Sequence, residues 1–230
     1  MRVSAILVAA GSGQRLGFNQ PKAFVMLAEA PMLCHCIRTI ARVDEIVEVV
    51  IAVPAGMESA ARAEAARAGV KLPVKLVPGG AERQDSVRRA LVLTSAESDI
   101  VVVHDAARPF APATLFNRCI EAAARAGGAI AAIPVADTLK RVDNPPAIDA
   151  TVARAGLWQA QTPQAFRRDL LIEAHRRAVR DAIAATDDAD LVERYGGRVE
   201  VVEASAMNLK ITTPADLEMA EAIATRRIVS

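Results

Sequence analysis

The feature that most constrains the fold of this chain is a regular alternation between short β-branched runs and longer stretches with helical periodicity. The β-branched runs predict buried strands over 3–9, 46–53, 74–77, 99–105, 129–135 and 198–204. The intervening stretches predict helices over 31–42, 57–68, 82–94, 112–126, 164–180, 187–195 and 214–225. Strands that alternate with helices in this way form a parallel sheet covered by helices. The chain of 230 residues, 52% of them hydrophobic, is therefore predicted to form a single α/β domain over 1–230.

One segment, 136–161, breaks the alternation. It contains short alternating stretches around Asp143-Asn144-Pro145-Pro146 and shows no helical period. This pattern predicts a β-hairpin arm that projects from the sheet. A long excursion from a compact domain usually serves binding or oligomerisation.

The overall charge and the cysteine content exclude several classes of protein. Lys and Arg total 28 against 27 for Asp and Glu. The chain therefore lacks the excess of positive charge that is typical of proteins that bind nucleic acids or membrane surfaces. No uncharged stretch reaches the roughly 20 residues of a membrane span. The apolar N-terminus leads into glycines and then bases, which predicts a core strand instead of a signal peptide. Three cysteines, an odd number in a chain of this size, favour a reducing cytoplasmic location.

Two clusters resemble metal sites but have simpler interpretations. Cys34-His35-Cys36 lacks a second ligand pair and lies in an amphipathic stretch, so these residues are predicted to pack in the core. The acids at Asp187, Asp188 and Asp190 are explained by a helix N-terminus. No metal ligands are therefore assigned to the chain. The single tryptophan, Trp158, is interpreted as an anchor in the core or at an interface.

The first predicted strand is followed by a glycine-rich loop with two cations, in LVAAGSGQRLGFNQPKAF. Glycines lack a Cβ, so their backbone N–H groups can approach a ligand closely. The loop matches neither the dinucleotide fingerprint, because Leu16 replaces a glycine, nor the P-loop. Ligands of open α/β sheets bind beyond the carboxyl ends of strands. The loop is therefore predicted to cradle a polyphosphate between Arg15 and Lys22; the alternative is a tight turn with solvated charges.

Two further strand ends carry candidate residues. The stretch PGGAERQDSV places Gly80 after a strand and Ser86 on the first turns of a helix, which a simple loop and capped helix explain equally well. The stretch VVVHDAARPF ends a buried strand in Asp105. An aspartate in this position commonly contacts a ribose or a metal, and the alternative is that it caps the next turn. His104 is interpreted as a packing residue.

Seven motifs, taken in order, extend this interpretation to a family: VAAGSGQRLGFNQPKAF, PGGAERQDSV, VHDAARPF, VADTLKR, RAGLWQAQTPQAF, TDDADLVE and NLKITTPADL. Together they span nearly the whole chain, which resembles the 2-C-methyl-D-erythritol 4-phosphate cytidylyltransferases. The resemblance implies a Rossmann-like, glycosyltransferase-A-like nucleotidyltransferase fold, and a homodimer formed through the β-arm. It also implies the transfer of CMP from CTP to 2-C-methyl-D-erythritol 4-phosphate, with Mg²⁺ held mainly by the CTP phosphates.

The resemblance also assigns residues by position. Arg15 and Lys22 are expected to stabilise the transition state at the α-phosphate. The expected nucleotide contacts are Ala9, Ala10, Gly11, Gly13, Gly80, Ser86 and Asp105. The expected acceptor contacts are Asp105, Arg108, Thr138, Arg154, Thr162, Thr186 and Lys210. Arg154 and Lys210 are counted as catalytic, and Thr138 and Arg154 are expected to come from the partner's arm. Ala81 departs from the family, which often has a polar residue there.

The implied chemistry needs no general base. The attacking atom is a phosphate oxygen, and the second pKa of a phosphate, about 6, leaves it mostly ionised at neutral pH. The rate is therefore expected to depend on positioning and on charge neutralisation by Arg15, Lys22, Lys210 and Mg²⁺. The nearest alternative is a cytidylyltransferase for another polyol phosphate, such as ribitol 5-phosphate. A non-catalytic nucleotide-binding module is a second alternative, but it would have no use for the acceptor-side Arg154 and Lys210.

Overall fold

The computed structural model of the chain describes residues 1–18, 20–144 and 146–229. Asn19 of the glycine-rich loop and Pro145 of the predicted arm turn therefore lie outside the described residues.

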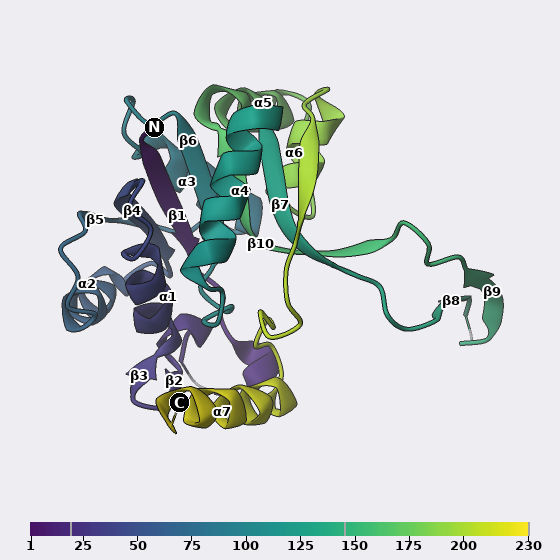
Figure 1. The fold of residues 1–230 in the computed structure, drawn as a ribbon, viewed down its shortest axis with the longest axis horizontal. Helices are drawn as coiled ribbons and strands as arrows, with labels where there is room; N and C mark the ends of the chain where they lie inside the picture. Colours follow the sequence, from purple (N-terminus) through teal and green to yellow (C-terminus); the bar gives the residue numbers. More distant parts are fainter. Residues whose placement is uncertain (19, 145, 230) are drawn as a thin grey trace.

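The centre of the molecule is a seven-stranded sheet in the order β11-β7-β10-β6-β1-β4-β5 (Figure 1). Its strands are β1 (Val3–Val8), β4 (Ile46–Val53), β5 (Val74–Pro78), β6 (Ile100–Asp105), β7 (Gly128–Pro134), β10 (Trp158–Arg167) and β11 (Val199–Glu203). Neighbouring strands are parallel except at β10, which runs antiparallel to both β6 and β7. The predicted α/β class with a mostly parallel sheet is confirmed, and so are all six predicted strands.

The prediction for the residues of β10 is wrong. The sequence pattern assigns residues 158–161 to the arm and residues 164–167 to a helix, but both belong to this strand, and α5 (Arg168–Arg180) begins only afterwards. The pattern misleads because the buried part of β10 is polar. Gln164 donates to Asp187 Oδ2 at 2.8 Å and accepts from the Asp188 backbone N–H at 3.2 Å, while Gln161 accepts from Asn208 at 2.8 Å. These partners are distant in sequence, so hydropathy cannot reveal that the strand is buried.

Helices cover both faces of the sheet (Figure 1). The helices α1 (Met32–Ile40), α2 (Glu58–Arg67) and α4 (Ala113–Ala126) pack on one face. The helices α3 (Arg83–Val92), α5 and α6 (Asp188–Arg194) pack on the other. Ala5 and Leu7 of β1 face the first layer and Ile6 faces the second. Because both faces are covered, the central strands are continuous apolar runs.

A third, smaller core brings the two ends of the chain together. The long C-terminal helix α7 (Pro214–Val229) lies beside the short pair β2 (Met26–Leu27) and β3 (Ala30–Pro31) (Figure 1). Ala220 of α7 is buried with Leu16, Leu27 and Ile211. The predicted helix start is confirmed, because the backbone N–H of Asp216 donates to Thr213 Oγ1 at 3.2 Å. This packing places the NLKITT segment next to the glycine-rich loop.

The arm projects far from the sheet, as Figure 1 shows. Its hairpin pairs β8 (Leu139–Val142) with β9 (Ile148–Val152) in antiparallel register. The predicted hairpin is thereby confirmed, although the last residues assigned to it belong to β10. Val142 and Ile148 remain 56% and 66% exposed on the arm.

Several smaller predictions are also resolved. Cys34 and Cys36 lie buried on α1, as the core interpretation requires. Trp158 is 42% exposed at the start of β10, so the core alternative is wrong, and an anchor at an interface stays a prediction. Among the described residues, no helix is both long and apolar enough to cross a membrane.

Candidate active site

A cavity of about 450 Å³ opens at the carboxyl ends of β1 and β6. It is lined by ten residues that the sequence analysis singles out: Ala9, Ala10, Gly11, Gly13, Arg15, Lys22, Gly80, Ser86, Asp105 and Lys210. They come from three separate stretches of sequence before β7 and from the segment before α7. The structure brings these stretches together at one edge of the sheet. The contacts with a nucleotide that the resemblance implies stay predictions.

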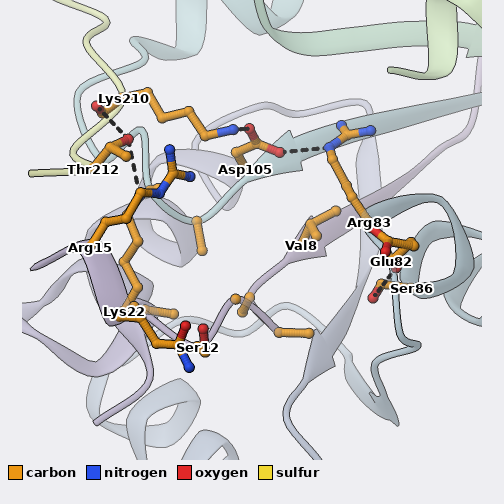
Figure 2. Close-up of a pocket in the computed structure, with 18 of the residues that line it drawn as sticks. Val8, Ser12, Arg15, Lys22, Glu82, Arg83, Ser86, Asp105, Lys210 and Thr212 are labelled. Carbon is orange, nitrogen blue, oxygen red and sulfur yellow. Dashed lines mark hydrogen bonds and ion pairs between the residues drawn. The ribbon is translucent and has the colours of Figure 1, made fainter. Parts of the chain in front are cut away.

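The glycine-rich loop forms one wall of the cavity because it folds back on itself. Gly13 has φ of +74°, and a Cβ there would lie only 3.0 Å from the Lys22 backbone nitrogen, so the turn requires glycine. The backbone N–H of Lys22 donates to the Gly11 carbonyl at 3.3 Å. These features bring Arg15 and Lys22, seven residues apart, to the same cavity (Figure 2).

The start of α3 forms the opposite wall. The backbone N–H of Gly80 donates to Ser86 Oγ at 3.0 Å, and that hydroxyl donates to the Glu82 carbonyl at 3.2 Å. A Cβ at Gly80 would overlap Asp85, so glycine is required here as well. The stretch does form a loop followed by a helix, but no side chain caps the helix at Glu82, so the alternative of a capped helix is only partly correct. Gly80 and Ser86 also line the cavity.

Asp105, at the end of β6, lies between two cations. Its Oδ1 is 3.1 Å from Arg83 Nε and its Oδ2 is 2.7 Å from Lys210 Nζ (Figure 2). Burial alone would raise the pKa of this carboxyl, but Arg83 and Lys210 outweigh it and hold the pKa far below the usual range. Asp105 is therefore ionised at neutral pH. Its carboxylate bonds to these cations at the cavity wall, so the alternative that it caps the next turn is wrong.

Arg83 is the main residue that the sequence interpretation missed. Besides Asp105, its guanidinium contacts Asp188, with Nη1 2.7 Å from Oδ2. Asp188 is 1% exposed and also contacts His175 Nε2 at 3.1 Å. The interpretation as a helix N-terminus is confirmed, because Asp187 caps α6 by accepting from the Asp190 backbone N–H, and Asp188 and Asp190 lie in its first turn. The contacts of Asp188 with Arg83 and His175 come in addition. No local pattern could pair Arg83 with an acid 105 positions later.

Lys22 completes a cluster of positive charge. Its ammonium donates to Thr212 Oγ1 at 3.3 Å. Burial, together with Lys210 and Arg15 nearby, lowers the pKa of Lys22 to about 8. Four cations, Arg15, Lys22, Arg83 and Lys210, therefore line a cavity whose acids, among the described residues, are Asp105 and Glu82. Such a cavity suits a ligand with several negative charges.

Arg108 and Thr162 do not line the cavity, but they lie next to residues that do. Arg108 Nη1 donates to the Asn208 carbonyl at 2.7 Å. Thr162 Oγ1 accepts from the Asp105 backbone N–H at 3.0 Å and lies 2.9 Å from His104 Nδ1. His104 is confirmed as a packing residue, because it is 1% exposed beside Phe116 and burial lowers its pKa to about 4. Arg108 and Thr162 thus support the wall, and their predicted acceptor contacts stay predictions.

The remaining three predicted residues are exposed and do not line the described cavity. Thr138 and Arg154 lie on the arm, where the Arg154 guanidinium donates to the Ala136 carbonyl. Thr186 precedes α6, and its backbone N–H donates to Asp190 Oδ2 at 3.3 Å. Within its own chain, the structure does not bring these side chains to Lys22. Their predicted roles toward the acceptor stay predictions.

Comparisons with known proteins agree with this geometry. The sequence model of the 2-C-methyl-D-erythritol 4-phosphate cytidylyltransferase family matches residues 3–226. The protein of that name from Deinococcus radiodurans is 46% identical over 222 residues, which cover 96% of this chain and 89% of that protein. Its namesake from Pelotomaculum thermopropionicum is 42% identical over 223 residues, which cover 96% of this chain and 94% of that protein.

Solved structures show the same relationship. The crystal structure of 2-C-methyl-D-erythritol 4-phosphate cytidylyltransferase from Thermus thermophilus superposes with a TM-score of 0.81 at 38% identity, covering 98% of this chain and 100% of that one. The 4-diphosphocytidyl-2C-methyl-D-erythritol synthase from Anaerococcus prevotii gives a TM-score of 0.85 at 30% identity, covering 98% and 99%. The chain therefore belongs to the 2-C-methyl-D-erythritol 4-phosphate cytidylyltransferase family of nucleotidyltransferases.

Proposed function

We propose that this protein transfers CMP from CTP to 2-C-methyl-D-erythritol 4-phosphate, giving 4-diphosphocytidyl-2-C-methyl-D-erythritol and pyrophosphate. The observation that carries the proposal is the convergence of Arg15, Lys22 and Lys210 on one cavity at the carboxyl ends of β1 and β6. The family relationship over 3–226 supports the choice of substrates.

In the proposed reaction, the acceptor's phosphate oxygen attacks the α-phosphorus of CTP directly, and the bond to the β-phosphate oxygen breaks. The acceptor phosphate is already mostly ionised, so no side chain has to remove a proton. The difficulty is electrostatic, because an anion must approach a polyanion. Arg15 and Lys22 neutralise charge at the α-phosphate, and Lys210 orients the acceptor phosphate. Asp105 fixes the Lys210 ammonium at 2.7 Å and so limits the directions in which it can point.

The proposed nucleotide preference follows from the small side chains of the cavity. Ala9, Ala10 and Gly80 leave room for a flat base, and a pyrimidine suits this space better than the larger purine. Asp105 lies at the end of β6, where a ribose hydroxyl can donate to a carboxylate. We expect CTP to be preferred over ATP and GTP for these reasons.

Mg²⁺ is proposed to bind together with CTP. In the described part of the chain, no three His, Cys, Asp or Glu side chains gather into a metal site. The cavity offers the carboxylates of Asp105 and Glu82, which fits an ion held mainly by phosphate oxygens. The bound ion would neutralise phosphate charge.

The proposed acceptor site includes the arm of a second copy of the chain. Thr138 and Arg154 are exposed on an arm that extends away from the cavity of its own chain (Figure 1). In a two-fold homodimer, each subunit can lend its arm to the other. A cytoplasmic location is proposed as well, because the buried thiols Cys34, Cys36 and Cys119 are free.

A direct assay tests the proposed function. Pyrophosphate release is measured with CTP and Mg²⁺ against 2-C-methyl-D-erythritol 4-phosphate and, in parallel, ribitol 5-phosphate. We expect rapid release only with the first acceptor and only in the presence of the divalent ion. Faster turnover of ribitol 5-phosphate, or comparable turnover with ATP in place of CTP, would contradict the proposal.

A further inference from the structure

The segment between Asn208 and α7 presents two side chains to the cavity from the same side. Lys210 and Thr212 both line the cavity, while Ile211 between them is fully buried in the third core. This alternation is what an extended backbone produces, because residues i and i+2 point the same way. The Ile211 backbone N–H donates to the Ala107 carbonyl at 2.9 Å. The segment is therefore held, between the two cavity-facing residues, to the turn that follows β6.

Thr212 is held in place independently of the ligand. Its backbone N–H and that of Thr213 each donate to Asp216 Oδ2 at 2.8 Å. Its hydroxyl donates to the carbonyl of Lys210 at 3.2 Å. Because a hydroxyl also has lone pairs to offer, the same Oγ1 can accept from the Lys22 ammonium at 3.3 Å. Figure 2 shows Thr212 next to Lys210, on the segment that the two residues share.

The hydrogen bond between Lys22 and Thr212 is important because few other interactions fix the position of the Lys22 ammonium. Among the hydrogen bonds of the described residues, Thr212 Oγ1 is the one side-chain acceptor of this ammonium. Lys210, by contrast, has a carboxylate partner in Asp105. An ammonium on a flexible four-carbon stem loses much rotamer freedom when it is fixed, so an acceptor already in position reduces that cost.

We propose that Thr212 is a positioning residue whose hydroxyl orients the Lys22 ammonium toward the cavity and favours its charged form. Thr212 thus links the two lysines of the site, which come from opposite ends of the chain. The inference rests on the proposed function for the role of Lys22 at the phosphate.

The charges around Lys22 show why an acceptor is needed. Burial is the largest influence and lowers the pKa of this lysine, and Lys210 and Arg15 lower it further. Asp105 and Asp216 are the acids that act in the opposite direction. A hydrogen bond accepted from the ammonium favours the charged form. Removing that acceptor is therefore expected to lower the pKa of Lys22 below its value of about 8.

The test compares three variants with the unmodified protein. Thr212→Val removes the hydroxyl at nearly constant shape, whereas Thr212→Ser retains it. Thr213→Val is the matched control, because Thr213 is exposed, caps α7 and does not line the cavity. The titration of Lys22 is followed by NMR of protein labelled with ¹³C at the lysine ε-carbon. The chain has five lysines, so the Lys22 signal can be assigned from its loss in Lys22→Ala.

In Thr212→Val we expect the Lys22 titration to shift down by roughly 0.5–1 pH unit, and kcat/KM for CTP at pH 8 to fall about fivefold to tenfold. Thr212→Ser should restore both values to within about twofold of the unmodified protein. Thr213→Val should lower the melting temperature through the lost cap but leave the Lys22 titration unchanged.

Two results would overturn the inference. One is a Lys22 titration in Thr212→Val that matches the unmodified protein, whatever happens to the rate. The other is an equal shift in Thr213→Val, because the effect would then come from disturbing the segment and not from the Thr212 hydroxyl. If the unmodified protein does not form the CDP-alcohol but Thr212→Val still shifts the titration, the proposed function fails while the link between Thr212 and Lys22 is supported.

Discussion

The nucleotide cavity and the arm differ in what holds their side chains in place. In the cavity, Asp105 bonds to Arg83 and Lys210, and Lys22 bonds to Thr212. On the arm, β8 pairs with β9, but the hairpin projects from the sheet with Val142 and Ile148 exposed. One half of the proposed site is therefore organised within a single chain before any ligand binds. The other half depends on the arm meeting a second copy of the chain.

The largest expected effect concerns stability at the cavity wall. Asp188→Ala removes a buried acid that contacts Arg83 and His175, which should lower the free energy of unfolding by roughly 3–5 kcal/mol. The matched substitution on the arm, Asp149→Ala, removes an exposed acid and should cost no more than about 0.5 kcal/mol. Urea denaturation of both variants measures the difference. Equal costs would show that the cavity wall is no better organised than the arm.

The next effect concerns catalysis within the cavity. Lys22→Ala should lower kcat by about a hundredfold or more, because it removes positive charge from the α-phosphate in the transition state. The fold should be little affected, since the Lys22 ammonium makes a single side-chain hydrogen bond among the described residues. Lys71→Ala, which removes an exposed lysine far from the cavity lining, is the control and should leave kcat unchanged. A Lys22→Ala variant with near-normal kcat would remove this residue from the mechanism.

The pH dependence of the reaction should also reflect the cavity, because Lys22 titrates there. The pKa of Lys22 is lowered to about 8, so this residue loses its proton as the pH rises through that value. The charged form is the one that neutralises phosphate, and kcat/KM for CTP should therefore fall about tenfold per unit above pH 8. In Lys22→Arg, whose guanidinium does not titrate in this range, the decline should move to higher pH. A decline that stays at the same pH in Lys22→Arg would have to belong to another group.

The smallest expected effect on the chain itself concerns the arm. Ile148→Asp places a charge on a side chain that is already 66% exposed, so the free energy of unfolding of the isolated chain should change by less than about 0.5 kcal/mol. The proposed dimer should nevertheless weaken, because a carboxylate would be buried at the interface. Sedimentation velocity over a range of concentrations measures this. A variant with unaltered self-association would show that Ile148 lies outside any dimer interface.

Much of the fold could be predicted because it depends on local pattern. The strands β1, β4 and β6 are mostly apolar on both faces. Such strands, when they alternate with helices along the sequence, indicate a parallel sheet that helices cover on both faces. The strand β10 could not be predicted, because its polar residues are satisfied by Asp187, Asp188 and Asn208, which lie far along the chain.

The same distinction applies to the site. Gly13, Lys22 and Asp105 can be recognised from the sequence, because a glycine-rich turn and an acid at the end of a strand have local causes. Arg83 was missed, since its importance comes from two acids that approach it only in the folded chain. For Thr138 and Arg154, the family resemblance supplied a role that the geometry of one chain does not provide.

In the proposed homodimer, the arm of each subunit completes the cavity of its partner, and an experiment that mixes two inactive variants tests this exchange. Lys22→Ala and Arg154→Ala, each nearly inactive alone, are dissociated, mixed in equal amounts and reassociated. If arms are exchanged, one site of every mixed dimer carries both defects and the other carries none. Random pairing makes about half of the dimers mixed, so roughly a quarter of the activity of the unmodified protein should return. No recovery, with mixed dimers demonstrated by native mass spectrometry, would contradict the claim and show that Arg154 does not complete the partner's site.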